Sequence, residues 1–444
     1  MKTPDLLRTK DGRSYLLPFI IVTSCFALWG FANDITNPMV KSFSKIFRMS
    51  VTDGALVQLA FYGGYFCMAL PAALFIKRHS YKAGILTGLG LYAFGALMFI
   101  PAAKTGNYYP FLISYFILTC GLSFLETSAN PFILSMGEKA TATRRLNFAQ
   151  SFNPIGSLCG MWVAMHFIQA RMSPLSTSER ALLDDASFNA LKASDLAVLV
   201  KPYAIIGVIL IAVFLLMWLT RMPGKGEVGL NPQEGVPTSL KATLGRLIRN
   251  VTYRRGVIAQ FFYIGAQITC WTFIIQYGTH VLTGEGIDEQ TAEITSQKLN
   301  IVAMVCFVTF RFISTWLMKY FKPSRMLAVF ATAAAILILG VIFIGGRTGL
   351  YCLVGVSAFM SLLFPTIYGM ALGNVANDTE IGSAGLIMAI LGGSVLPPLQ
   401  AMIIDRPQVM GLAGVNASFI IPFICFLVVL WYGFSETRRS AARA

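Results

Sequence analysis

Residues 109–137 read YPFLISYFILTCGLSFLETSANPFILSMG, an apolar stretch that contains a single charged side chain, Glu126. A helix needs about 20 mostly apolar residues to cross a bilayer, and this stretch is longer than that. Similar stretches recur along the whole chain, at 16–39, 54–76, 83–102, 109–137, 147–170, 202–220, 256–283, 294–318, 326–345, 350–375, 382–404 and 415–434. The sequence therefore predicts an all-α integral membrane protein with twelve transmembrane helices.

A polar segment divides these stretches into two sets of six. We expect an N-terminal six-helix half at 1–221, a cytoplasmic linker at 222–255 and a C-terminal six-helix half at 256–444. Within the linker, apolar residues from Leu240 to Val251 recur at helical spacing among basic residues. This pattern predicts a short basic helix on the membrane surface.

Composition and charge agree with a membrane protein and exclude a soluble enzyme of this size. Of the 444 residues, 56% are hydrophobic and only 12% are charged, whereas soluble domains carry about 25% charged residues. The net charge is +15, and it reflects topology. With the N-terminus inside, cytoplasmic segments hold 23 Lys and Arg residues and external segments hold 11. This bias predicts a multi-pass protein of the cell (inner or plasma) membrane with both termini cytoplasmic, and it removes the reason to expect nucleic-acid binding.

No sequence pattern indicates a cofactor, a metal site or an enzyme. The eight cysteines lie in apolar runs without CxxC spacing, which is typical of small buried residues. The three histidines, His79, His166 and His280, are scattered and do not form the cluster that a membrane-embedded enzyme needs. A receptor would need a sizeable soluble signalling domain, which the short polar segments do not provide. A channel is the remaining rival to a carrier, and saturable uptake with trans-stimulation would separate the two.

Three charged side chains lie deep inside predicted spans: Asp34, Glu126 and Arg311. Each costs about 2.5–3.5 kcal/mol near the bilayer centre on insertion scales, so its presence requires a reason. One hypothesis is a structural ion-pair network between helices. The other is a carboxylate that takes up and releases a proton as its surroundings become wet and dry, because burial disfavours its charged form. Arg311 keeps its charge in either case, so we expect it to fix a carboxylate, a backbone carbonyl or a substrate hydroxyl.

Amide and indole side chains accompany these charges at helical spacing. Asn147, Gln150 and Asn153 recur every three residues and predict one amide stripe on the fifth span. Amides pair with sugar hydroxyls, and indoles pack against the C–H face of a sugar ring. The alternative is that the amides hold helices together. We expect a polar cavity that binds a sugar through Trp29, Asp34, Asn37, Glu126, Asn130, Gln150, Asn153, Gln267 and Trp271.

Several motifs resemble a known family. Two six-helix halves with a basic loop at 76–84 are similar to the major facilitator superfamily. More specific blocks resemble the L-fucose:proton symporter family over about residues 12–434: FYGGYF at 61–66, SYKAGILTG at 80–88, LETSANPF at 125–132, RLNFAQSFN at 145–153, YIGAQITCW at 263–271 and RFISTW at 311–316.

The resemblance implies import of a monosaccharide, L-fucose first, by proton symport and alternating access. It implies proton coupling through Glu126 and sugar contacts through Gln150 and Asn153. The family's first-helix acid falls on Asn37, whereas the acid of this chain, Asp34, lies three residues earlier on the same helix face. We expect Asp34 to couple protons or to bind the sugar.

One departure from the family pattern leaves the substrate open. The tenth span carries Phe364 where the family has a tyrosine, and a lost hydroxyl there would change substrate choice. The alternative is a glucose/galactose or N-acetylglucosamine carrier, without strict proton coupling. The expected partners are a monosaccharide, a proton and the lipid bilayer, and the protein is expected to be a monomer.

Overall fold

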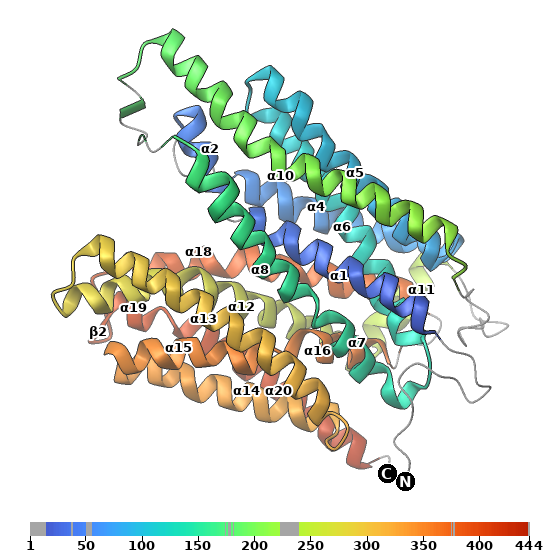
Figure 1. Cartoon of the computed structure of the whole chain (residues 1–444). Coiled ribbons are helices and arrows are strands. Elements are labelled where there is room, and N and C mark those ends of the chain that lie inside the picture. Colours follow the sequence, from blue (N-terminus) through green and yellow to red (C-terminus); the bar gives the residue numbers. More distant parts are fainter. Residues whose placement is uncertain are drawn as a thin grey trace. The chain divides into compact units, whose positions relative to one another are not determined.

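The computed structural model describes residues 15–36, 39–49, 56–173, 175, 179–180, 182–222, 239–373, 375 and 378–442. These residues are almost entirely helical (Figure 1), and eleven helices among them are long and apolar enough to cross a membrane. The predicted all-α membrane fold is therefore confirmed.

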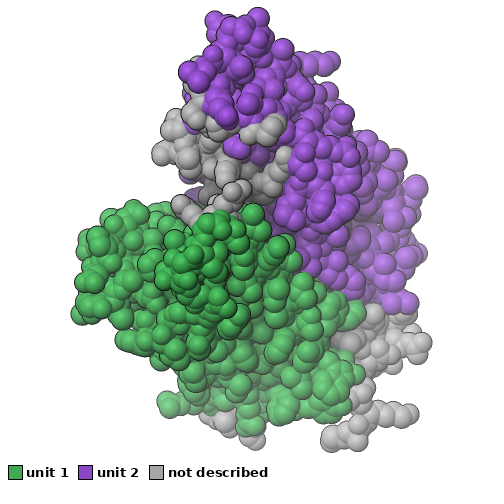
Figure 2. Space-filling view, turned by 60° about the vertical axis from the view of Figure 1, so that its left-hand side comes forward, with its two compact units in different colours: residues 1–14, 134–151, 231–444 green, residues 15–133, 152–230 purple. Residues whose placement is uncertain are grey.

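Residue contacts divide the chain into two compact units, which Figure 2 shows in different colours. In the described part of the chain, unit 2 consists of residues within Tyr15–Ile133 and Phe152–Leu230. Unit 1 consists of residues within Leu134–Ser151 and Asn231–Ala444. Each unit thus contains two segments that are separated in the sequence.

Unit 2 is built from long apolar helices of the first six predicted spans. Its elements are α1 (Leu16–Thr36), α2 (Met39–Phe47), α4 (Leu56–Arg78), α5 (Tyr81–Thr105), α6 (Tyr109–Ser135), α8 (Asn153–Val163), η2 (Ala164–Ile168), η3 (Gln169–Arg171) and α10 (Asp185–Leu219). Helix α10 begins well before the apolar run predicted from 202. The reason is a cap, because the Asp184 side chain accepts a hydrogen bond from the Ser187 backbone N–H at 3.1 Å. The hydrogen bonds from Ser187 also hold the pKa of Asp184 below its ordinary value.

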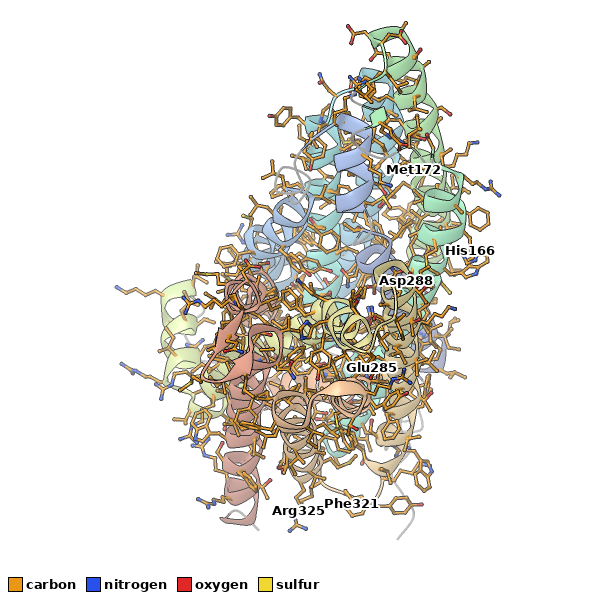
Figure 3. The ribbon with its side chains drawn as sticks, turned by 90° about the vertical axis from the view of Figure 1, so that its left-hand side faces the viewer. His166, Met172, Glu285, Asp288, Phe321 and Arg325 are labelled. Atoms are coloured by element: carbon orange, nitrogen blue, oxygen red, sulfur yellow. The ribbon has the colours of Figure 1, made fainter. Side chains whose placement is uncertain are left out.

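Unit 1 contains the remaining spans and the linker helix. Its elements are η1 (Lys139–Thr141), α7 (Ala142–Gln150), α11 (Leu240–Arg249), α12 (Val251–Gly284), α13 (Glu289–Leu317), α14 (Pro323–Leu339), η4 (Gly340–Ile344), α15 (Gly346–Met360), α16 (Leu363–Leu372), α17 (Thr379–Met388), η6 (Ala389–Leu391), α18 (Gly392–Ile404), α19 (Gly414–Ala417) and α20 (Ile420–Ala442). A short antiparallel hairpin joins Gln408–Val409 to Leu412–Ala413. Helix α13 crosses the unit, so that Glu285 and Asp288 lie near one end of it and Phe321 and Arg325 near the other (Figure 3).

The fifth span, predicted at 147–170, is interrupted and does not form one unbroken helix. Helix α7 ends at Gln150, two residues form a turn, and α8 begins at Asn153. Pro154 occupies the first turn of α8, where its missing N–H leaves no hydrogen bond unmade. A π-helical turn that carries His166 then follows (Figure 3). Because α7 and α8 are each short, the fifth span is not among the eleven long helices.

The basic helix predicted within 222–255 is present as α11, and its place on the membrane surface stays a prediction. The Ser239 hydroxyl caps it by accepting a hydrogen bond from the Ala242 backbone N–H at 3.2 Å. Arg246 donates to both carboxylate oxygens of Asp378, at 2.7 and 2.6 Å, and these bonds raise the pKa of Arg246 above its ordinary value. The chain re-enters a helix at Val251, five residues before the predicted start of the seventh span at 256.

Candidate functional site

The buried acid of unit 2 is Glu126 on α6. Its side chain is only 5% exposed, within a stretch from Leu118 to Ile133 in which every residue is buried. The hydroxyl of Tyr65 on α4 donates a hydrogen bond to Glu126 Oε1 at 3.0 Å. Ser123 of α6 donates to the backbone oxygen of Tyr65 at 3.1 Å, which holds the two helices together beside the acid. The partner that the structure gives Glu126 within unit 2 is therefore a neutral phenol.

The second acid of this unit is Asp34 on α1. Asp34 is partly exposed and interacts electrostatically with Tyr62, which is one helical turn from Tyr65. Helix α4 thus carries both the tyrosine that bonds to Glu126 and a tyrosine that interacts electrostatically with Asp34. In the sequence, the FYGGYF block supports a family resemblance but predicts no role for its tyrosines. Two phenols one turn apart in an apolar helix were the available signal, because a buried phenol needs a hydrogen-bond partner.

Asn153, at the start of α8, binds the backbone of α1. Its Nδ2 donates to the Phe26 oxygen at 3.1 Å. The two helices approach closely because glycines face backbone atoms: a Cβ at Gly156 would lie 1.8 Å from the Ala27 oxygen, and a Cβ at Gly30 would lie 2.0 Å from the Asn153 oxygen. The Asn153 side chain thus holds two helices together, as the alternative interpretation of the amides expects.

Two further predicted residues, Trp29 and Asn130, lie in this unit. Trp29 on α1 is 4% exposed and packs on Phe26 with ring centroids 4.1 Å apart. Asn130 is fully buried one turn after Glu126 on α6. Asn37 lies outside the described residues.

The buried cation, Arg311 on α13, belongs to unit 1. Its guanidinium carbon lies 4.8 Å from the ring centroid of Phe307, and its Nη1 donates to the Gln150 backbone oxygen at 3.4 Å. A backbone carbonyl is one of the three partners that the sequence predicted for this arginine. The positive charge is thus held by a π face and a carbonyl oxygen, neither of which takes up a proton.

Two predicted residues on α12 lie in the same unit. The indole Nε1 of Trp271 donates to Ser357 Oγ of α15 at 3.2 Å, and the indole packs edge-on against Phe307 at 5.0 Å and 78°. Gln267, one turn earlier, is partly exposed. Phe307 and Ser357 were not among the predicted site residues. Phenylalanine and serine are common in apolar helices, and only the contacts of these two residues distinguish them.

The predicted amide stripe does not form on one helix. The break after Gln150 assigns Gln150 to unit 1 and Asn153 to unit 2. Asn147 instead donates to Thr366 Oγ1 of α16 at 3.2 Å. The three-residue spacing predicted a shared face only on the assumption of an unbroken helix.

The chemistry available in the two units is therefore different. Among the predicted site residues, unit 2 offers two carboxylates, which as a class can gain and lose a proton, and one of them, Glu126, accepts a hydrogen bond from a phenol. Unit 1 offers a permanent cation, an indole and amides, which suit neutral hydroxyl groups and the face of a sugar ring. Among the described residues, no group of three or more His, Cys, Asp or Glu side chains is placed to hold a metal ion.

Comparisons with known proteins point to one group. The sequence model of the Major Facilitator Superfamily matches residues 22–424. The L-fucose-proton symporter of Haemophilus influenzae is 51% identical over 95% of this chain and 97% of its own length. The L-fucose-proton symporter of Escherichia coli is 37% identical over 94% of this chain and 93% of its own length. A glucose/galactose transporter of Brucella abortus is 28% identical over 96% and 95%.

Solved structures of similar fold agree with these sequence comparisons. The crystal structure of the major facilitator transporter FucP in the outward conformation matches with a TM-score of 0.83 and 36% identity, over 95% of this chain and 99% of that one. A proton:xylose symporter matches with a TM-score of 0.65 at 14% identity, over 94% of each chain, and this likeness concerns the fold alone.

Proposed function

The chain belongs to the Major Facilitator Superfamily, and on that premise we propose that it imports L-fucose together with a proton. It is a multi-pass membrane transporter and not an enzyme. The similarity to two L-fucose-proton symporters over nearly the whole chain supports the substrate pair. The structural observation that carries the proposal is the Glu126 carboxylate, buried in α6 and hydrogen-bonded by Tyr65.

Glu126 is proposed as the proton-binding group. A carboxylate in an apolar helix is costly while charged, so a change in hydration around it changes its proton affinity. The Tyr65 hydroxyl serves both protonation states, because a carboxylate and a carboxylic acid each accept a hydrogen bond. Asp34, which interacts electrostatically with Tyr62, is proposed as a second proton-coupling or sugar-binding acid.

The sugar site is proposed to draw on both sets of polar residues. Carboxylates, amides and indoles together satisfy the hydroxyls and the apolar face of a hexose. The proposed sugar contacts are Trp29, Asp34, Asn37, Glu126, Asn130, Gln150, Asn153, Gln267 and Trp271, with Arg311 as a fixed charge that organises unit 1. The Nδ2 bond of Asn153 to α1 means that a sugar would meet this amide already oriented by α1.

The proposed cycle is alternating access. Glu126 takes up a proton from outside, sugar binds, and the two six-helix halves, 1–221 and 256–444, rock so that sugar and proton leave to the cytoplasm. The orientation, with both termini inside, rests on the excess of Lys and Arg in the cytoplasmic segments. We further propose that the protein works as a monomer in the bilayer of the cell (inner or plasma) membrane.

Uptake by purified protein in liposomes tests the function. A panel of labelled sugars containing L-fucose, D-glucose, D-galactose and N-acetylglucosamine is offered with and without an inward proton gradient. We expect L-fucose to accumulate only with the gradient. Preferred uptake of glucose or galactose would favour the alternative, to which the similarity with glucose/galactose transporters also points. Gradient-independent accumulation would refute proton symport.

A further inference from the structure

Phe307 and Ser357 have no assigned role, yet each contacts a functional candidate in unit 1. We propose that they are positioning residues: Ser357 and Phe307 fix the indole of Trp271, and Phe307 also fixes the guanidinium of Arg311, so that together they set the affinity for sugar. This inference rests on the proposed function, because Trp271 is one of its sugar contacts.

The indole of Trp271 is held at two different places. Its Nε1 donates to Ser357 Oγ at 3.2 Å, and its ring packs edge-on against Phe307 at 5.0 Å and 78°. Two contacts on different parts of the ring restrict both side-chain torsions of a tryptophan. Ser357 and Phe307 are 1% and 2% exposed, whereas the indole between them is partly exposed. The anchors are thus buried, and part of the indole is left for a ligand.

Phe307 connects this indole to the buried cation. Arg311 lies one turn after Phe307 on α13, and its guanidinium carbon is 4.8 Å from the ring centroid. The other end of the guanidinium donates to the Gln150 backbone oxygen. A continuous series of contacts therefore runs from Ser357 through Trp271, Phe307 and Arg311 to Gln150, across α15, α12, α13 and α7.

The Ser357 hydroxyl has a partner that a nearby serine lacks. Ser361 lies four residues later, is also fully buried, and its Oγ has no hydrogen-bond partner in the described part of the chain. The two serines share type, burial and neighbourhood but differ in the contact with Trp271. Ser361→Ala is therefore a matched control for Ser357→Ala.

The first test measures L-fucose uptake by the full-length protein in liposomes. We expect Ser357→Ala to raise KM about three- to tenfold, the effect of losing one hydrogen bond, with maximal rate almost unchanged. Ser357→Thr, which keeps the hydroxyl, restores the KM, and Ser361→Ala leaves it unchanged. Equal KM values for Ser357→Ala and Ser361→Ala would overturn the role of Ser357.

The second test examines Phe307 against a phenylalanine that lacks these contacts. Phe310, on the same helix, packs on Phe359 instead. We expect Phe307→Leu to raise the KM for L-fucose more than Ser357→Ala does, because both Trp271 and Arg311 lose a contact, and Phe310→Leu to raise it less. A larger rise in KM for Phe310→Leu than for Phe307→Leu would refute the proposal that the Phe307 ring positions both Trp271 and Arg311.

A spectroscopic arm is independent of the transported sugar. In full-length protein whose other five tryptophans are replaced by Phe, Trp271 alone emits. We expect Ser357→Ala to shift its emission maximum, because the indole loses its hydrogen bond, and Ser361→Ala to leave it in place. If L-fucose proves not to be the substrate, the uptake arm fails while this shift persists. An unchanged spectrum in Ser357→Ala refutes the positioning contact itself.

Discussion

Two buried charges, Glu126 in unit 2 and Arg311 in unit 1, are held in opposite ways. Glu126 accepts a hydrogen bond from the Tyr65 hydroxyl at 3.0 Å. Arg311 lies over the Phe307 ring at 4.8 Å and donates to the Gln150 carbonyl at 3.4 Å. The partner of the acid suits either protonation state, whereas the partners of the arginine suit only a permanent cation. On the proposed function, this contrast predicts that the change of charge takes place in unit 2, whereas the charge held in unit 1 stays fixed.

The largest expected effect is that of Glu126→Gln. The amide keeps the shape and accepts the Tyr65 hydrogen bond but carries no exchangeable charge, so accumulation of L-fucose against its gradient should be lost. Sugar counterflow, which needs no net proton movement, should persist. Both are measured with labelled L-fucose in liposomes. Accumulation at the wild-type level would remove Glu126 from the proton pathway.

Arg311→Met should have the second-largest effect, and it should lower accumulation and counterflow of L-fucose to the same extent. The substitution removes a desolvated cation–π contact of about 2 kcal/mol and a charge-assisted hydrogen bond. We expect accumulation and counterflow each to fall about 30-fold. Arg311→Lys, which keeps the charge but lacks the planar fork, should lie between this variant and the wild type. Loss of accumulation with normal counterflow would place Arg311 in the coupling step and break the contrast between the units.

Tyr65→Phe should have a smaller effect and change the initial rate of uptake only a few-fold. The variant removes the Tyr65 hydroxyl that donates to Glu126. The pH at which uptake is half-maximal should therefore change, while the dependence on pH remains. Initial uptake rates between pH 5.5 and 8 measure this. The control is Tyr115→Phe. In the wild type, the Tyr115 hydroxyl is hydrogen-bonded to the Tyr203 hydroxyl at 2.6 Å and not to an acid. Identical pH profiles for the two variants would show that Tyr65 does not influence the acid.

Arg246→Ala should have the smallest effect. We expect the ion pair of Arg246 with Asp378 to contribute to the stability of the fold and not to transport. Asp378 raises the pKa of Arg246, so the charged pair is present at every pH below the ordinary value for arginine and contributes fully between pH 6 and 8. Because the pair is partly exposed, the melting temperature should fall by at most about 2 °C. Uptake should be unchanged, and a substantial loss would give the linker helix a role in transport.

Sequence patterns were reliable where one segment carries all of the information. Length and hydropathy located the helix that carries Glu126, and the basic, amphipathic spacing after residue 239 predicted α11. They failed where a cap extends a helix or a turn interrupts one. The Asp184 cap lengthens α10 into a segment that hydropathy reads as a loop, and the turn at Ser151 divides the fifth span into α7 and α8.

The partners of the candidate residues were beyond the reach of sequence patterns. Tyr65 and Glu126 are 61 residues apart, and Trp271 and Ser357 are 86 apart. Helical periodicity relates residues three or four positions apart, and it does not say which faces of different helices meet. Asn153 shows the consequence, because its spacing predicted a ligand contact and the structure gives its Nδ2 a backbone oxygen of α1.

The sequence by itself determined that this chain crosses a membrane many times and that Asp34, Glu126 and Arg311 are its costly charges. Both conclusions follow from the free energy of transferring side chains into hydrocarbon, which each segment carries alone. Only the tertiary structure decided that a phenol holds Glu126 and that one ring holds both Trp271 and Arg311. Those choices depend on which helix faces pack together, and that is a property of the folded chain as a whole.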